Sequence, residues 1–220
     1  MGHSREMTIA ERRQAILAEL DAAAAPAPTL IAVSKRQPDA RIDAALAAGQ
    51  IVFGENQVQE AQARWQRRRT ERPDLDLHLV GALQSNKAED AVALFDTIHS
   101  LDRPKLVTAL AKAMDKTGRR PRLFIQVNTG EEPQKSGVLP GGLPALLGAA
   151  RGAGLPVEGL MCLPPAGEPA APHFALLAKL ARREGLCELS MGMSGDYALA
   201  ARLGATFVRV GTGIFGPRPS

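Results

Sequence analysis

The sequence predicts an α/β fold, a single (β/α)8 barrel of the TIM type that spans residues 1–220. Short apolar runs of strand length alternate with longer amphipathic segments, and this alternation is typical of a parallel sheet connected by helices. Eight such runs occur, a number that favours a closed barrel over an open sheet. No linker divides the chain, so we expect one domain.

A leading helix is predicted over residues 8–25, because Ile9, Ile16, Leu17 and Leu20 recur at helical spacing. Prolines at its end separate it from the first strand. The strands are predicted from apolar runs bounded by turn residues, at 29–34, 51–53, 75–81, 95–99, 122–128, 157–163, 187–191 and 206–210.

The connecting helices are predicted from their amphipathic pattern and their end signals. Pro38 suits a first helical turn, Gly49 suits a helix end, and Asp102 before Pro104 suits a helix start. The seven predicted helices cover 38–48, 55–69, a segment opening near 85, 102–116, 143–153, 173–184 and 196–203.

The charge pattern argues against a nucleic-acid partner. The net charge is only +4, and the arginine pairs and triplets are short and scattered along the chain. Aromatic residues make up 4% of the chain, too few to stack on bases. We therefore interpret these arginines, residues 67–69 among them, as solvated helix surface.

Cysteine usage and apolar content indicate a cytoplasmic protein. Cys162 and Cys187 both fall in predicted buried strands, show no metal-ligand spacing, and are too few for a disulfide scaffold. No apolar run reaches the roughly 18 residues that a membrane span needs. Residues 1–7 lack the apolar core of a signal peptide. We expect no membrane partner.

Lys35 is the first candidate functional residue. It lies at the carboxyl end of the first predicted strand, where α/β barrels place their chemistry. Partial burial there would lower the pKa of its ammonium group and let the amine attack a carbonyl carbon. Taken alone, the same position is also compatible with a surface lysine in a loop.

Two loops after the last two strands predict a phosphate site. Residues 190–196 and 209–216 are rich in glycine, serine and threonine. In (β/α)8 barrels the loops after strands seven and eight often bind phosphate, through backbone amides that glycine leaves accessible. Ser190, Ser194 and Thr212 offer hydroxyl donors. The alternative is that these glycines are ordinary turn residues.

Arg209 is a charge inside the apolar strand at 206–210, on the face opposite its two valine neighbours. Such a charge needs a partner, either a structural salt bridge or a ligand. Lys35, the phosphate loops and Arg209 together match pyridoxal 5'-phosphate (PLP). The lysine would hold its aldehyde as an aldimine, the loops its phosphate, and the arginine would face its ring nitrogen.

These residues belong to motifs that resemble the pyridoxal phosphate homeostasis protein family, over nearly the whole chain from Leu30 to Gly216. The motifs are residues 32–35 (AVSK), 53–56 (FGEN), 78–87 (HLVGALQSNK), 135–137 (KSG), 159–161 (GLM), 189–194 (LSMGMS) and 208–212 (VRVGT). The sequence departs from the family pattern at Gln57, where many relatives carry Tyr, and at Leu77, where Trp is common.

The resemblance implies the PLP-binding barrel shared with the N-terminal domain of alanine racemase. It assigns Lys35 to the Schiff base with PLP and Arg209 to the ring nitrogen. It also implies cofactor contacts for the remaining matched positions, which are Asn56 in the pocket and Ser190, Gly211 and Thr212 at the phosphate.

The resemblance further implies a PLP-binding protein of vitamin B6 and amino-acid homeostasis without substantial turnover. Alanine racemase takes a catalytic tyrosine from a second domain. The only tyrosine here is Tyr197, at a predicted helix start, and the chain stops nine residues after Gly211. Arg209 would also keep the ring nitrogen unprotonated and so weaken carbanion chemistry. We expect a monomer that hands PLP to apo-enzymes.

Other readings stay open at this point. The first alternative is a PLP-dependent enzyme resembling amino-acid racemases, and the second is a phosphate-binding barrel enzyme without PLP. Lys87 and Lys135 could each rival Lys35 as the aldehyde-binding lysine. His78 and His99 are expected to be hydrogen-bonded core residues.

Overall fold

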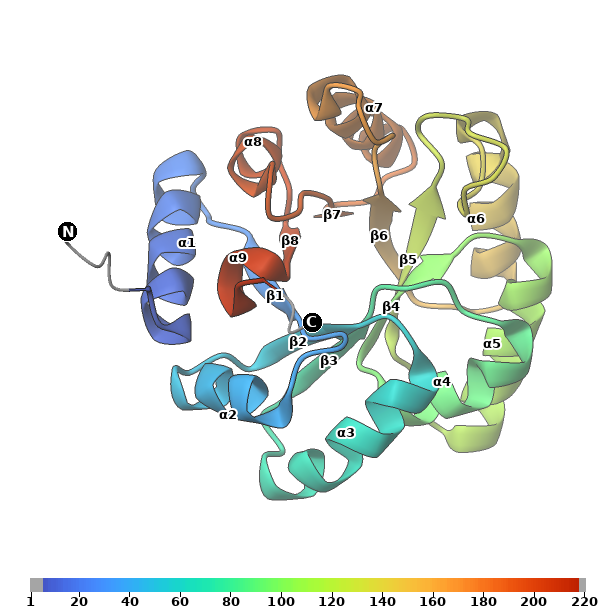
Figure 1. Cartoon of the computed structure of the whole chain (residues 1–220). Helices are drawn as coiled ribbons and strands as arrows, with labels where there is room; N and C mark the ends of the chain where they lie inside the picture. The colour runs from blue at the N-terminus through green and yellow to red at the C-terminus, as the bar shows by residue number, and fades with distance from the viewer. Residues whose placement is uncertain (1–5, 218–220) are drawn as a thin grey trace.

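The computed structural model describes residues 6–217 and confirms the predicted barrel. Eight parallel strands follow one another in chain order around the barrel, and the last pairs with the first. Figure 1 shows the strands at the centre and helices around them. The strands are β1 Thr29–Val33, β2 Val52–Glu55, β3 Asp76–Leu79, β4 Thr97–Leu101, β5 Arg122–Val127, β6 Val157–Cys162, β7 Glu188–Ser190 and β8 Phe207–Val210.

The helices form the outer layer and bury their apolar faces against the strands. They are α1 Ile9–Ala23, α2 Asp39–Ala47, α3 Val58–Glu71, α4 Ala88–Leu94, α5 Pro104–Thr117, α6 Leu143–Gly152, α7 Ala170–Arg183, α8 Tyr197–Arg202 and α9 Thr212–Phe215. Two 3-10 turns precede helices, η1 Ser85–Lys87 and η2 Pro140–Gly142. Residues 1–5 of the segment considered for a signal peptide lie outside the described residues.

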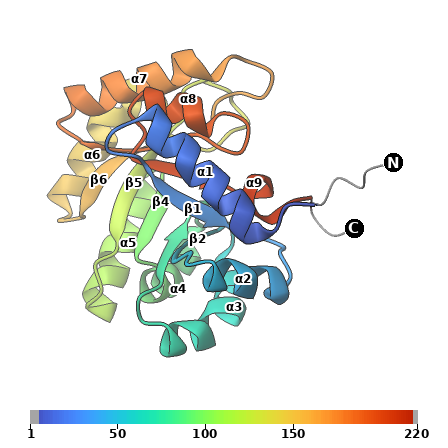
Figure 2. The ribbon, with the colours of Figure 1, turned by 90° about the vertical axis from the view of Figure 1, so that its left-hand side faces the viewer.

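The leading helix α1 takes part in the outer ring. A capping box starts it: the Thr8 hydroxyl accepts from the Glu11 amide at 3.2 Å, and the Glu11 carboxylate accepts from the Thr8 amide at 2.8 Å. The helix packs against α8, α9 and α2, as Figures 1 and 2 show. It therefore fills the position in the outer ring of helices between α8 and α2.

The main differences from the sequence prediction lie at element ends. Strand β2 continues through Gly54 and Glu55, which pair with β3, so α3 begins at Val58 and not at residue 55. Helix α5 has Arg103 as its N-cap, and the Asp102 side chain does not cap it, contrary to the prediction. The short helix α9 was not predicted, because four residues are too few to show a periodic pattern.

The barrel interior holds a layer of aromatic and imidazole rings. Phe124 stacks on His99 with 4.6 Å between ring centroids, and His78 Nδ1 lies 2.8 Å from His99 Nε2. Phe207 packs edge-on against Phe124. Burial lowers the pKa of His99 well below its usual value, helped by nearby positive charges. Both histidines are fully buried, which confirms their prediction as hydrogen-bonded core residues.

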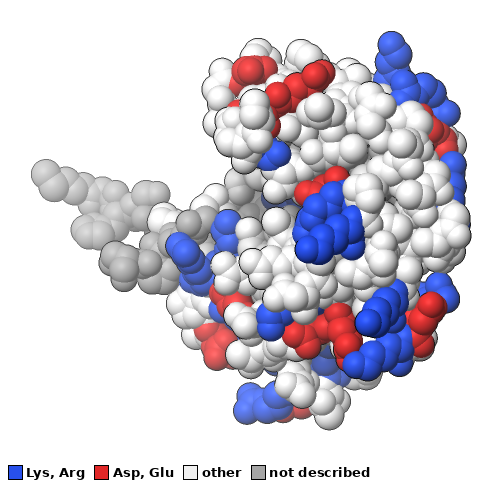
Figure 3. Space-filling model, turned by 90° about the vertical axis from the view of Figure 1, so that its right-hand side faces the viewer, with Lys and Arg blue, Asp and Glu red and all other residues white. Residues whose placement is uncertain are grey.

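Two side-chain predictions were wrong. Arg68 and Arg69 are mostly buried: Arg68 pairs with Asp43 at 2.9 Å and Arg69 pairs with Asp96 at 2.9 Å. Cys187 is exposed, because β7 begins one residue later than predicted. On the face in Figure 3, basic and acidic side chains lie beside one another. Within residues 6–217, no helix is both long and apolar enough to span a membrane.

Candidate functional site

A cavity of about 320 Å³ opens at the carboxyl ends of the strands. Five of the six predicted binding residues line it, and Ser190 does not. Within the described chain, no acidic side chain lines it either. The lining residues are Val33, Lys35, Asn56, Val80, Leu163, Met193, Ser194, Arg209, Gly211 and Thr212.

Lys35 enters this cavity from the end of β1. The alternation of β1 directs Ile31 toward the barrel interior, and Lys35 follows with the same parity. Its side chain is half-buried, and among residues 6–217 its ammonium group has no hydrogen-bond or ion-pair partner. Glu60 lines a small neighbouring cavity with Lys35, but no carboxylate of residues 6–217 forms an ion pair with it, so the amine is available to a ligand.

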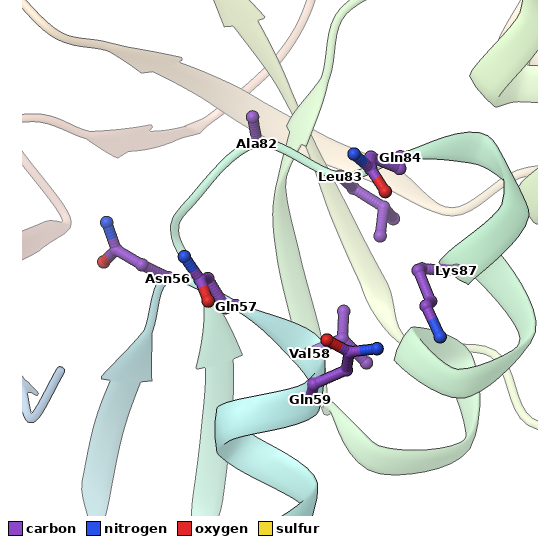
Figure 4. A pocket seen from close by; sticks show the side chains of 8 residues that line it. All are labelled: Asn56, Gln57, Val58, Gln59, Ala82, Leu83, Gln84 and Lys87. Atoms are coloured by element: carbon purple, nitrogen blue, oxygen red, sulfur yellow. The ribbon is translucent and has the colours of Figure 1, made fainter. Parts of the chain in front are cut away.

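The two rival lysines line different cavities. Lys87 lies in a cavity of about 400 Å³ between α3 and η1, across from Asn56, as Figure 4 shows. Lys135 lines a third cavity of about 340 Å³ and pairs with Glu132 at 2.6 Å. Asn56 borders all three cavities, whereas neither rival reaches the one that holds Lys35.

Arg209 lines the cavity of Lys35 from the interior face of β8, and the residue is 4% exposed. One guanidinium nitrogen donates to the Ser190 hydroxyl at 2.6 Å and another to the Cys162 carbonyl at 2.8 Å. Burial lowers the pKa of Arg209 to about 10, so the group still carries its charge at neutral pH.

No counter-charge sits on this arginine in the described part of the chain. Burial raises the pKa of the neighbouring Cys162 thiol to about 12, so the thiol is neutral at pH 7. No carboxylate lies within ion-pair distance of Arg209 among residues 6–217, although Asp196 contributes a more distant attraction. A buried charge with only neutral partners is costly, and an electron-rich ligand would relieve that cost.

The loops after β7 and β8 meet through hydroxyl groups. The Ser194 hydroxyl accepts from the Gly213 amide at 3.2 Å and from the Thr212 hydroxyl at 3.2 Å. Ser190 is fully buried beneath Arg209, so it supports the arginine and does not face the cavity. The sequence offered both serines as donors, and the structure brings Ser194 to the cavity.

Two glycines let the backbone approach closely at this rim. A Cβ atom on Gly81 would lie 2.2 Å from the Asn56 carbonyl oxygen, so only glycine admits Asn56 in its position. A Cβ atom on Gly211 would lie 3.3 Å from the Val33 carbonyl oxygen, a tight contact at the end of β1. Both close approaches lie beside cavity-lining residues.

Tyr197 is held away from this cavity. Its hydroxyl donates a hydrogen bond to Glu19 of α1. Burial, and then that hydrogen bond, raises the pKa of Tyr197 to about 12. The side chain lines a neighbouring groove with Glu19 and residues of α8, and Ser194 borders both this groove and the cavity. A phenol so placed does not line the cavity and is not ionised at neutral pH.

The cavity combines an amine that has no partner among residues 6–217, a buried guanidinium and a glycine-rich rim with two hydroxyl groups. This donor set suits a small anionic ligand that carries an aldehyde. No group of three or more His, Cys, Asp or Glu side chains in residues 6–217 is arranged to hold a metal ion.

Comparisons with known proteins agree on one family. Residues 13–219 match the family model "Alanine racemase, N-terminal domain". The pyridoxal phosphate homeostasis protein of Pseudomonas aeruginosa is 42% identical over 197 residues, which cover 86% of this chain and 84% of that protein.

Solved structures give the same picture. PipY of Synechococcus elongatus, solved with PLP bound, is 42% identical, with a TM-score of 0.84 over 95% of this chain and 100% of that chain. A histidine racemase from Leuconostoc mesenteroides shares the fold at 16% identity, with a TM-score of 0.70 over 97% of this chain and 58% of that chain.

Proposed function

Because this chain belongs to the family of pyridoxal phosphate homeostasis proteins, we propose that it binds PLP in the cavity of Lys35 and Arg209. Its role would be the homeostasis of this vitamin B6 cofactor and of amino acids, carried out by a single barrel domain. The observation that carries the proposal is the pair of cations in one cavity whose lining includes no described carboxylate.

The residues present fit this cofactor. PLP supplies an aldehyde that a lysine amine can hold as a Schiff base. Among the described residues that line the cavity, Lys35 alone offers an amine, and Arg209 offers a donor for the ring nitrogen. A phosphate carries more than one negative charge, and the cavity's cations and the hydroxyls at its rim would stabilise it.

The phosphate would be held at the rim where the two glycine-rich loops meet. Thr212 and Ser194 offer hydroxyls there, and Gly211 leaves its backbone accessible. We assign Ser190 a different role, the orientation of Arg209, because its hydroxyl accepts from that guanidinium at 2.6 Å. Asn56 would close the side of the cavity nearest the neighbouring cavities.

The proposed role involves no substantial turnover. Racemisation needs two acid/base groups on opposite faces of the substrate carbon. Lys35 is one candidate, but Tyr197 is bound to Glu19 and does not line the cavity. The charged Arg209 at the ring nitrogen would also keep that nitrogen unprotonated, which disfavours carbanion chemistry.

The same reasoning extends to partners and location. We propose a monomeric, cytoplasmic protein that delivers PLP to PLP-requiring apo-enzymes. Support comes from the homeostasis function in the names of its relatives. Size-exclusion chromatography with light scattering tests the monomer, and transfer of PLP to an apo-transaminase tests delivery.

An absorbance spectrum of the purified protein with PLP tests the binding proposal. A Schiff base between PLP and an amine absorbs in the visible range and is fixed by borohydride. Mass spectrometry of the reduced protein should then find the modification on the peptide containing Lys35. A protein that shows no such band with PLP, or a label on another lysine alone, would contradict the assignment.

A further inference from the structure

A buried carboxylate lies behind Lys35, outside the cavity. Glu55 ends β2 and is fully buried, with its side chain toward α3. Its Oε1 atom accepts three hydrogen bonds: from the Ser34 hydroxyl at 2.7 Å, from Arg64 at 2.9 Å and from the Trp65 indole at 2.9 Å. The described chain provides no hydrogen-bond partner for its Oε2 atom.

Arg64 connects this carboxylate to the backbone on both sides of Lys35. Its guanidinium donates to the Ser34 carbonyl at 3.1 Å and to the Gln37 carbonyl at 3.1 Å. It also pairs with Glu60 at 3.2 Å. One side chain of α3 therefore fixes the residue before Lys35 and the residue two positions after it.

The remaining loop residue is fixed as well. Arg36 has a φ of 56°, in the left-handed region that a residue with a Cβ atom adopts at a cost. Its amide donates to Glu60 at 2.8 Å. Every residue that flanks Lys35 is thus bound to Glu55, Arg64 or Glu60, while Lys35 itself has no partner in the described chain.

The position of this ion pair is informative. The desolvation cost of a buried ion pair can exceed the attraction between its charges, so the Glu55–Arg64 pair is weak evidence of a role in stability alone. Neither side chain lines the cavity of Lys35. What the pair does contact is the four-residue segment from Ser34 to Gln37 that carries the lysine.

We propose that Glu55 and Arg64 are positioning residues that fix the Lys35 backbone so that its amine meets the aldehyde of PLP. The inference rests on the proposed function and adds two residues outside the cavity to it. A small displacement of a reacting group lowers the rate and the affinity strongly, even when the change lies one layer away.

Arg64→Gln and Arg69→Gln form a matched pair for the test. Both arginines lie on α3, and each binds a carboxylate and at least one backbone carbonyl group. Arg69 contacts Asp96 and the Leu94 carbonyl, away from the Lys35 loop. Both variants lose an ion pair of α3, which is buried at Glu55 for Arg64 and partly buried for Arg69. Denaturant unfolding of each variant therefore measures the loss of stability separately from ligand binding.

The affinities of two ligands distinguish a positioning role of Arg64 from a general effect on folding. PLP can form the Schiff base, whereas pyridoxamine phosphate has an amine in place of the aldehyde and tests only ring and phosphate binding. Arg64→Gln should raise the dissociation constant of PLP roughly tenfold to a hundredfold, because the aldehyde is captured less well. It should leave the dissociation constant of pyridoxamine phosphate unchanged. Arg69→Gln should change neither.

Equal weakening of both ligands by Arg64→Gln, or equal effects of the two variants, would overturn the positioning role. If Arg64→Gln does not fold, Ser34→Ala decides, because it removes only the hydroxyl that donates to Glu55. It should slow borohydride-trapped labelling of Lys35 by PLP, and an unchanged rate would overturn the inference. Failure of the wild-type protein to form a visible band with PLP would instead refute the proposed function.

Discussion

Two arginines mark the two ends of the barrel interior, and they differ in what balances their charge. Arg122 begins β5 at the amino end, pairs with Asp76 at 3.3 Å and lies over the Phe207 ring at 5.6 Å. Arg209 lies two residues after Phe207 on β8, toward the carboxyl end. Its partners are a hydroxyl and a carbonyl. The ring layer that includes Phe207, Phe124 and His99 lies in the interior between these ends.

The comparison contrasts a charge that acidic partners balance within the fold with a charge that the described fold leaves without an acidic partner. Arg122 is about one third exposed and has acidic partners, so its charge is balanced without a ligand. Arg209 is buried and lacks an acidic partner in the described chain, so the fold alone leaves it partly uncompensated. Ligand binding should therefore depend on the carboxyl end, and stability on the amino end.

Lys35→Ala tests the carboxyl end with the largest expected effect. The variant lacks the amine in the cavity, so the visible band with PLP should disappear completely. Lys87→Ala and Lys135→Ala should keep the band, because these lysines line other cavities. A full band in Lys35→Ala would move the assignment to one of those two lysines.

Arg209→Met and Arg122→Met test the comparison directly. Arg209→Met should weaken PLP binding about tenfold to a hundredfold, the loss expected for one hydrogen bond to a charged group. The stability of the ligand-free variant should be unchanged or raised, since an unbalanced buried charge is removed. Titration with PLP and denaturant unfolding measure the two quantities.

Arg122→Met should give the opposite pattern. Its partly exposed ion pair predicts a loss of about 1 kcal/mol in the free energy of unfolding, and PLP affinity should stay unchanged. If Arg122→Met instead weakens PLP binding and Arg209→Met mainly destabilises the fold, the assigned roles of the two ends are wrong.

Thr212→Ala and Ser194→Ala test which residues at the carboxyl end of the barrel bind the phosphate of PLP. Each removes a hydroxyl at the proposed phosphate position and should cost roughly 1.5–3 kcal/mol of PLP binding energy. Pyridoxal, which lacks the phosphate, should lose little affinity. Ser190→Ala should weaken PLP and pyridoxal alike, because its hydroxyl acts through Arg209. Equal losses for both ligands in Thr212→Ala would mean that the loops do not hold the phosphate.

Much of the site could be predicted because parallel strands place their ends at one edge. Lys35, Asn56 and Gly211 all follow strands, and barrel closure alone brings them to one cavity. Arg209 was visible as a charge in an apolar strand. The closed order of strands followed from the repeated alternation of strand and helix patterns, since each βα unit adds the next neighbour.

Other features of the candidate site could not be predicted. They depend on which face of a strand each side chain occupies and on which strands pair, and neither can be read from the sequence. Ser190 and Ser194 lie in one motif, but only the structure separates the buried hydroxyl from the one at the cavity. Glu55 follows a glycine and resembles a helix start, although its pairing with β3 makes it a strand residue. The role proposed for Glu55 and Arg64 was hidden for this reason.

The smallest expected effect concerns catalysis, because we expect almost no turnover of amino acids by the PLP-loaded protein. PLP-loaded protein should exchange the α-proton of L-amino acids, and interconvert their enantiomers, only slowly. Both rates should fall far below the turnover of an ordinary enzyme, which is about 1 per second or faster. Lys35 could move one proton, but Tyr197 is bound to Glu19 and its pKa of about 12 keeps it protonated. Tyr197→Phe should therefore leave the slow exchange unchanged. NMR exchange and chiral chromatography measure both rates, and fast turnover that Lys35→Ala abolishes would establish an enzyme.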